Sequence, residues 1–291
     1  MLRYNNVEVV IQGYFSFANS PYYAHKRLSA VDIYSPSREE VVSPFTGELV
    51  FYRVVHREHV SGYIVGDYYI RLLHVKPYQE LGGKIVIGAL LGRLVESPFF
   101  YPWTDLHMHL EVRGKPEFIR ASGGLRLEPS SQLLEEMEKS LREAEPLREA
   151  KINGKIVLVR HGRYMLVEPD NKVSGPITPL VVEVNGVKGF IDGGIPHYRH
   201  GIFVSPFKKI NGDVIGFSNI LLGVVDKYYG WGFHHFIVDR RRLKVYLNDV
   251  KVKGIGLYIG APFIKIIPVD WSNMDYREGD RVEVSFRNVG V

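Results

Sequence analysis

Two histidines separated by a single residue, His107 and His109, are the strongest indication of chemistry in this chain. Apolar and polar residues alternate from Leu106 to Arg113, which predicts a β-strand with both imidazoles and Glu111 on one face. Side chains two residues apart on a strand lie roughly 7 Å apart, so one ring can bind a metal ion while the other contacts substrate or water. Such a pair can also be purely structural, because a short motif is specific only in context.

Further residues of metal-binding types lie upstream. Asp32 and His74 each lie in a short β-type segment, and His25 precedes both. The chain has no cysteine, so histidine and carboxylate side chains are its best zinc ligands. A catalytic zinc ion uses three protein ligands and leaves a fourth position for water. His25, Asp32 and His109 would provide these ligands. His74 and His107 would then be left for proton transfer and for stabilising an oxyanion.

Five short segments add the context that the histidine pair needs. They are the His25 to Asp32 segment, the Ser-Pro-Phe-Thr-Gly-Glu-Leu-Val segment at 43–50, and residues 69–75, 81–92 and 107–113. In this order they resemble the lysostaphin-type, LytM-like zinc metallopeptidase family over approximately residues 7–114. The resemblance implies a two-sheet antiparallel fold of the barrel-sandwich hybrid type, with Zn²⁺ in a groove across one sheet.

The same resemblance implies a role for each candidate residue. His25, Asp32 and His109 match the zinc ligands of the family, and His74 and His107 match its catalytic histidines. The expected activity is that of a zinc-dependent metallo-endopeptidase, a hydrolase in which metal-activated water cleaves a peptide bond. The expected substrate is a peptide or a peptidoglycan-like molecule.

Two segments depart from the family pattern. Six residues separate His25 from Asp32 where the family has three, so this loop must fold back to bring His25 to the metal. The segment 94–104 is rich in proline and aromatic residues and replaces a Gly/Ser-rich loop. We interpret its large rings as a hydrophobic clamp packed on the sheet rather than as direct substrate contacts, because large aromatic side chains are usually buried. These rings are Phe99, Phe100, Tyr101 and Trp103.

The hydrophobic patterning predicts a mainly β protein in three parts. Residues 1–120 read as short strands of a LytM-like metallopeptidase domain, and residues 121–150 as a helical connector. Ser130 or Ser131 is the expected N-cap of the helix, and Pro146 should end or kink it. Residues 151–291 predict an all-β sandwich or barrel of unknown role. Its Asn-Gly pairs at 153–154, 185–186 and 211–212 are typical of hairpin turns.

The basic residues of the third part raise the question of a nucleic-acid partner. Residues 151–291 contain 20 Lys and Arg against 13 Asp and Glu, with clusters at 240–244 and 208–209. A charge run alone says little about a partner, so we interpret the cluster as a solvated hairpin end and do not expect nucleic-acid binding. We also interpret the aromatic segment 228–235 as core. Asp192, His197 and His200 are read as a surface loop rather than as a second metal site.

The alternative to a zinc metallopeptidase is a catalytically silent binding or scaffold protein that keeps the peptidase-like fold.

No signal peptide and no apolar run long enough to span a membrane is evident in the sequence. We therefore expect a cytoplasmic location by default, or an extracellular one if a targeting segment is missing from this sequence. The chain has only three glutamines, a bias seen in thermophile proteins. The oligomeric state is left open.

Overall fold

The computed structural model describes residues 1–37, 39–272 and 274–290 and shows a mainly β protein, as the patterning predicts. The described residues form two compact units. The N-terminal unit comprises Met1–Phe17 and Tyr22–Leu133, and the C-terminal unit comprises Ala18–Pro21 and the chain from Leu134 onward. No helix in the described part of the chain has the length and apolar character that a membrane crossing needs.

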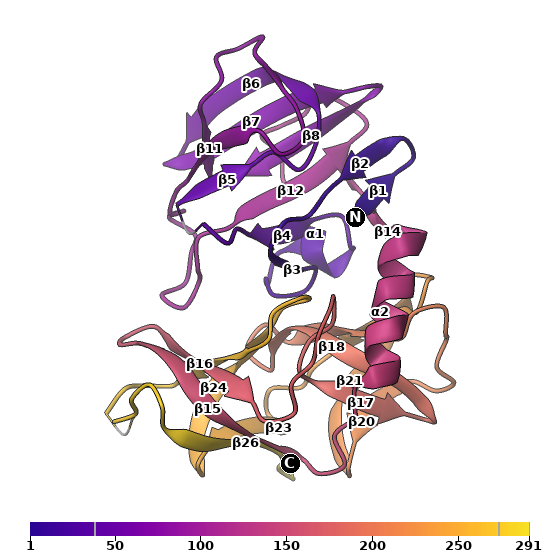
Figure 1. Ribbon diagram of the computed structural model, residues 1–291, viewed down its shortest axis with the longest axis vertical. Helices are drawn as coiled ribbons and strands as arrows, with labels where there is room; N and C mark the ends of the chain where they lie inside the picture. Colours follow the sequence, from indigo (N-terminus) through magenta and orange to yellow (C-terminus); the bar gives the residue numbers. More distant parts are fainter. Residues whose placement is uncertain (38, 273, 291) are drawn as a thin grey trace. The chain divides into compact units, whose positions relative to one another are not determined.

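A large antiparallel sheet dominates the N-terminal unit (Figure 1). Its strands lie in the order β10 (Lys84–Ile85), β6 (Gly47–Val55), β7 (Glu58–Val65), β8 (Tyr68–Leu73), β12 (Met108–Arg113), β4 (Val31–Tyr34) and β3 (Tyr14–Ser16), with β13 (Gly124–Leu125) also paired to β12. Two small sheets accompany it. One contains β5 (Glu40–Val42), β11 (Leu90–Leu94) and β9 (Val75–Pro77), and the other β14 (Glu128–Pro129), β1 (Leu2–Tyr4) and β2 (Val7–Val9).

Strand β12 carries His109, directly follows His107 and lies between β8 and β4. His109 is paired directly with Asp32 on β4 and with Leu73 on β8. His109 and Arg113 both contact the Glu111 carboxylate, so these three side chains lie on one face as the alternation predicts, and all side chains of β12 are buried. Because a strand between two partners is fixed in register, this arrangement brings Asp32 and His109 side by side.

The two helices of the described residues differ in length. Helix α1 (Tyr23–Lys26) is a single turn, whereas α2 (Ser131–Glu143) lies within the predicted helical connector 121–150. The prediction is wrong outside α2, because β13 and β14 precede it and residues 144–150 are not helical. The Ser130 side chain accepts a hydrogen bond from the backbone N–H of Leu133 at 3.2 Å, which confirms it as the N-cap. Helix α2 ends three residues before Pro146, so that proline lies beyond the helix rather than within it.

The C-terminal unit contains a closed antiparallel barrel (Figure 1). Strand β25 (Ile264–Pro268) pairs with both β16 (Tyr164–Pro169) and β24 (Val250–Leu257), which closes a ring completed by β23 (Leu243–Leu247), β26 (Arg281–Asn288) and β15 (Lys151–Arg160). The structure thus shows a barrel where the sequence left a sandwich or barrel open. From β24 the sheet continues in the order β18 (Val187–Ile195), β19 (His200–Val204), β22 (Phe233–Ile237), β21 (Ile220–Tyr228) and β20 (Val214–Phe217), and β17 (Val181–Val184) also pairs with β18.

Of the three Asn-Gly pairs, only one forms the hairpin turn that the sequence predicts. The pair at 185–186 forms the predicted turn between β17 and β18, and both residues have the positive φ that this turn requires. The prediction is wrong for the pair at 153–154, which lies inside β15. A Cβ on Gly154 would come within 2.5 Å of the Glu168 carbonyl oxygen, so this glycine permits close strand contact. It is also wrong at 211–212, because that loop joins β19 to β20, which do not pair.

Candidate metal centre

The structure brings His25, Asp32 and His109 together in the N-terminal unit, and this group can hold a metal ion. The Nε2 atom of His25 is 3.3 Å from Oδ1 of Asp32 and 3.2 Å from Nδ1 of His109. The third side of the triangle, from His109 Nδ1 to Asp32 Oδ1, is 2.9 Å. Ligands of a tetrahedral ion with bonds of about 2.0 to 2.1 Å lie about 3.3 Å apart, so the triangle is close to metal-binding size.

The six residues between His25 and Asp32 form a compact turn. His25 lies in the single turn of α1, and Leu28 then adopts a left-handed conformation with φ of 53°. The backbone N–H and hydroxyl of Ser29 both donate to the Ala24 carbonyl, at 3.0 and 3.1 Å. The chain therefore turns back sharply before β4 begins, and the extra residues form this turn instead of displacing His25.

The outer nitrogen of each histidine contacts an acceptor that fixes the ring. His25 donates from Nδ1 to the Phe17 carbonyl at 2.9 Å, and His107 donates from Nδ1 to the Asp105 carbonyl at 2.8 Å. His109 instead uses Nε2, which lies 3.0 Å from Oε1 of Glu111. In a neutral ring, a hydrogen on the outer nitrogen leaves the lone pair on the inner one. This is the arrangement that orients histidines in metal sites.

Glu111 is a candidate site residue to which the sequence interpretation gave no role. It accepts hydrogen bonds from His109 and, at 2.6 Å each, from the guanidinium groups of Arg71 and Arg113. All four side chains are buried. Glu111 therefore holds the His109 ring with Nδ1 toward the centre. The signal was present in the sequence, because Glu111 follows His109 on the same strand face.

His74 lies beside the centre and has a carboxylate partner of its own. Its Nδ1 is 2.9 Å from Oε1 of Glu58, and the Ser97 hydroxyl donates to the other oxygen of that carboxylate. His74 has a φ of 66°, which is uncommon for a residue other than glycine. Its ring centroid lies 4.9 Å from that of His107. Glu58 lies far from His74 in sequence, so no local pattern identified it.

Burial and hydrogen bonding shift the pKa values of the ligand groups in opposite directions. Burial alone would raise the pKa of Asp32, but the neighbouring His25 and His107, with hydrogen bonds from His109 and His25, hold it well below its ordinary value. Burial opposes the protonation of His109, yet its hydrogen bonds to Asp32 and Glu111 raise its pKa to about 9. Without a metal ion, His109 is therefore a cation between two carboxylates at neutral pH.

The two remaining histidines have lowered pKa values. Burial lowers the pKa of His107 to about 4, although the Asp32 charge acts in the opposite direction. Burial also lowers the pKa of His74, and the hydrogen bond and charge of Glu58 counteract it in part. Both rings are thus neutral at pH 7, and each can accept a proton or a hydrogen bond through its unprotonated nitrogen.

The structure contradicts part of the hydrophobic-clamp interpretation of the aromatic loop, residues 94–104. Phe100 stacks on the ring of His107 with a centroid distance of 4.9 Å and meets His74 edge-on at 4.7 Å, as a clamp would. Phe99 and Tyr101 are 55% and 45% exposed, so the clamp interpretation is wrong for these two. The backbone N–H groups of Phe99 and Phe100 bond to the hydroxyl and the carbonyl of Ser97, and the resulting turn separates neighbouring rings. Trp103 is half-buried and stacks on Tyr101.

The second group of metal-type residues behaves differently from expectation. Asp192 and His200 are fully buried on β18 and β19, so the surface-loop interpretation is wrong for them. Asp192 accepts a hydrogen bond from the backbone N–H of Ala18, and His200 bonds to the Ser20 carbonyl and to His235. Among the described residues, Asp192, His197 and His200 do not form a metal-binding group. Asp192 and His200 instead bond to the segment that contains Ala18 and Ser20.

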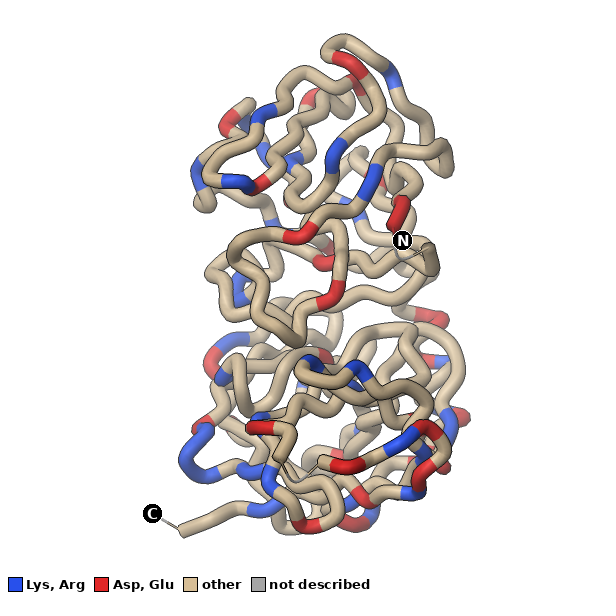
Figure 2. The backbone as a smooth tube through the Cα atoms, turned by 90° about the vertical axis from the view of Figure 1, so that its left-hand side faces the viewer, with Lys and Arg blue, Asp and Glu red and all other residues tan. Residues whose placement is uncertain are grey.

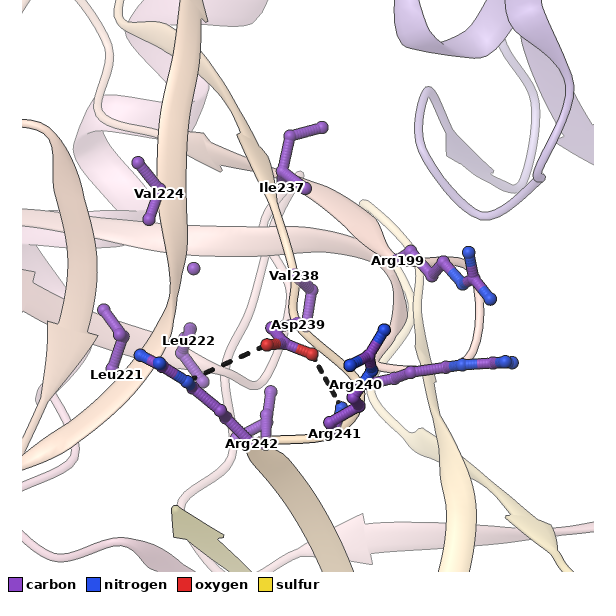
Figure 3. Close-up of a pocket in the computed structure, with 12 residues that line it drawn as sticks. Arg199, Leu221, Leu222, Val224, Ile237, Val238, Asp239, Arg240, Arg241 and Arg242 are labelled. Atoms are coloured by element: carbon purple, nitrogen blue, oxygen red, sulfur yellow. Dashed lines mark hydrogen bonds and ion pairs between the residues drawn. The ribbon is translucent and has the colours of Figure 1, made fainter. Parts of the chain in front are cut away.

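The arginines at 240–242 surround a pocket in the C-terminal unit together with Arg199 (Figure 3). They are exposed, as expected, but the loop connects β22 to β23, which do not pair, so it is not a hairpin end. Asp239 pairs with Arg242 at 3.8 Å. Elsewhere in this unit, basic and acidic segments are interspersed along the backbone (Figure 2). In the aromatic segment 228–235, Tyr229 and Phe233 are buried, in agreement with the core interpretation, but Tyr228 is 37% exposed, so the interpretation is wrong for that residue.

Comparison with known proteins adds a family resemblance without a function. Residues 6–129 match a family model described as the N-terminal domain of a domain of unknown function, DUF8155. The matched segment includes His25, Asp32, His74, His107 and His109. No curated protein matches the chain. The candidate metal centre thus lies entirely within the part of the chain that is similar to this family.

Proposed function

We propose that the N-terminal unit is a zinc-dependent metallo-endopeptidase with the two-sheet fold of lysostaphin-type, LytM-like enzymes. The observation that carries the proposal is the triangle of His25 Nε2, Asp32 Oδ1 and His109 Nδ1, with sides of 2.9 to 3.3 Å. The ring centroid of His74 lies 6.1 Å from that of His109 and 4.9 Å from that of His107. Ligands for a metal and groups for proton transfer are therefore adjacent.

The donor set suits zinc better than the alkaline-earth ions. Two imidazole nitrogens and one carboxylate oxygen are ligands that zinc uses in catalytic sites, whereas calcium and magnesium prefer oxygen ligands alone. Glu111 and the Phe17 carbonyl provide the outer partners that zinc-bound histidines usually have. The triangle leaves a fourth coordination position for water. These residues therefore fit the group that the sequence resemblance implies.

Zinc held by these residues would polarise the scissile carbonyl and make a water molecule acidic enough to ionise near neutral pH. The histidines of the chain then divide the proton transfer. His107 has its Nε2 3.6 Å from Asp32 Oδ1 and is placed to accept a hydrogen bond from the attacking water. His74 can take up the proton, because Glu58 on its Nδ1 stabilises the resulting imidazolium, and can pass it to the leaving amine.

Metal analysis of protein purified without a histidine tag tests the proposal first. We expect stoichiometric zinc, and peptide cleavage that a chelator abolishes and added zinc restores. His107→Ala should keep zinc and lose turnover, and Glu58→Gln should keep zinc and lower turnover as His74→Ala does. A folded protein that binds no divalent metal would contradict the enzyme and favour the binding or scaffold alternative.

A further inference from the structure

A largely apolar pocket opens beside the candidate metal centre, entirely within the N-terminal unit. It has a volume of about 640 Å³, and His74, His109 and Glu111 form one side of it. Val60 and Leu73, from β7 and β8, contribute aliphatic surface next to these residues. Any substrate positioned at the centre therefore has this hollow next to its reacting bond.

Aromatic rings form another wall of the pocket. Tyr22, Tyr23 and Phe99 line it and are 51%, 63% and 55% exposed. Large aromatic rings are usually buried, and exposed apolar groups that gather around a hollow mark binding sites. The Tyr22 hydroxyl donates to the Phe99 carbonyl at 3.4 Å, so the segment before α1 and the aromatic loop are joined at the pocket. Arg27 in the long spacer donates to the Tyr23 hydroxyl at 2.9 Å and lies over its ring.

The charged groups that line the pocket already have partners. Arg71 donates to Glu111 at 2.6 Å and to the Phe118 carbonyl at 2.7 Å, and Glu58 accepts from His74 at 2.9 Å. A charged substrate side chain would lose its hydration here and would compete with these internal ion pairs. An apolar side chain only replaces water against aromatic and aliphatic surface.

We propose that this pocket binds a large apolar side chain, preferably aromatic, next to the scissile bond of the peptide substrate. The inference rests on the proposed function and narrows its substrate class. A peptide that consists only of glycine leaves the pocket filled with water and gains nothing from its walls. The two segments in which the chain departs from the peptidase pattern, the spacer after His25 and the loop 94–104, support and build this selectivity.

Quenched fluorescent peptides of the form Gly-Gly-Xaa-Gly-Gly test the selectivity with zinc-loaded protein. With phenylalanine or leucine at Xaa, we expect kcat/KM at least tenfold above the value with glycine, and with glutamate we expect the lowest value. Equal rates for phenylalanine and glycine, or a preference for glutamate, would overturn the proposal. Cleavage of the whole set at equal rates would leave the peptidase intact and remove only the pocket's role.

Two variants test whether the aromatic rings of the pocket cause the preference for phenylalanine over glycine. Phe99→Ala and Tyr23→Ala should reduce the preference for phenylalanine over glycine about tenfold, mainly through KM, with zinc content unchanged. Tyr101→Ala is the matched control, because Tyr101 is an exposed aromatic residue of the same loop that does not line the pocket. The same loss in the control, or no loss in either pocket variant, would contradict the proposal.

A binding experiment keeps the inference testable if no peptide is cleaved. Calorimetric titration of zinc-loaded protein with acetyl-Gly-Phe-Gly-amide should give at least tenfold tighter binding than acetyl-Gly-Gly-Gly-amide, and Phe99→Ala should remove the difference. Binding without cleavage would contradict the peptidase but support the pocket. Equal binding of both peptides would overturn the pocket even if metal is present.

Discussion

The sheet around β12 and the barrel of the C-terminal unit bury different kinds of side chain. The barrel core consists mainly of valine, isoleucine and leucine, such as Ile156, Val245 and Val284. The polar face of β12 instead buries Glu111 and Arg113, with Asp32 beside them. Burying ions costs several kcal/mol each before their pairing is counted, so such a cluster is weak evidence for stability. The comparison teaches that the N-terminal unit tolerates this cost at the place where the proposed metal ion and proton transfer would need fixed polar groups.

The largest expected effect on stability comes from removing the carboxylate at the centre of the buried network. Glu111→Ala leaves the guanidinium groups of Arg71 and Arg113 without their buried counter-charge, and we expect a loss of about 3 to 5 kcal/mol in the free energy of unfolding. Denaturant titration of the metal-free protein measures it, with exposed Glu8→Ala as the control. A loss below about 1 kcal/mol would show that the network is not tightly coupled.

Truncation of a side chain in the barrel core should be nearly as destabilising but should leave zinc binding unchanged. Ile255→Ala removes a fully buried aliphatic side chain, for which a loss of about 2 to 5 kcal/mol is typical. Zinc affinity should stay at the wild-type value, because Ile255 belongs to the other unit. Parallel denaturation and zinc titration check both points. Weakened zinc binding in the folded variant would break the contrast between the two regions.

The pH dependence of metal-free stability should come from His109. Its pKa is raised from 6.5 to about 9 in the folded protein, so its protonated form is stabilised by folding. This contribution is complete below about pH 6.5 and is lost as the pH rises through about 9. His107 and His74 have lowered pKa values and act in the opposite direction near pH 6.5, so unfolding midpoints of metal-free protein should fall as the pH rises from about 7.5 to 9, and His109→Gln should flatten this fall. A midpoint that rises over this range would contradict the assignment.

The pH dependence of zinc affinity should also report the protonation of His109. Because His109 must release its proton to bind the metal, the apparent affinity should rise about tenfold per pH unit between pH 7 and 9. Calorimetry in buffers of different ionisation enthalpy measures the released proton directly. Zinc affinity that does not change over this range would argue against His109 as a ligand.

The smallest effect is expected at an exposed ion pair in the C-terminal unit. Arg281 makes two hydrogen bonds to the carboxylate of Asp170, and both side chains are largely exposed. Solvent screening makes such pairs weak, so Arg281→Gln should leave the unfolding midpoint unchanged within error. A clear decrease would show that exposed and buried pairs in this protein are more alike than the comparison implies.

Local patterns in the sequence predicted the parts of the centre that depend on strand geometry. Alternation in residues 106–113 placed His109 and Glu111 on one face, and the structure confirms this face. The position of His25 could not be derived in the same way, because it depends on the turn of α1 and the left-handed Leu28. The partnership of Glu58 with His74 depends on the pairing of β7 with β8, which local patterns do not specify.

The C-terminal unit was predicted at a coarser level. Strand signals indicated an all-β fold, but barrel closure depends on β25 pairing not only with the preceding strand β24 but also with β16, which is distant in the sequence. Turn residues misled at Asn153, because a glycine that permits close strand packing has the same sequence signature as a hairpin turn. The burial of Asp192 and His200 also escaped sequence reasoning, since short glycine-rich segments are typical of surface loops.

Anomalous diffraction at the zinc absorption edge, from crystals of zinc-loaded protein, tests the central claim most directly. We predict a single strong peak in the N-terminal unit at about 2.0 to 2.2 Å from His25 Nε2, Asp32 Oδ1 and His109 Nδ1. Absence of a peak among these three atoms at full zinc loading, with the His25 ring turned away from Asp32, would contradict the account.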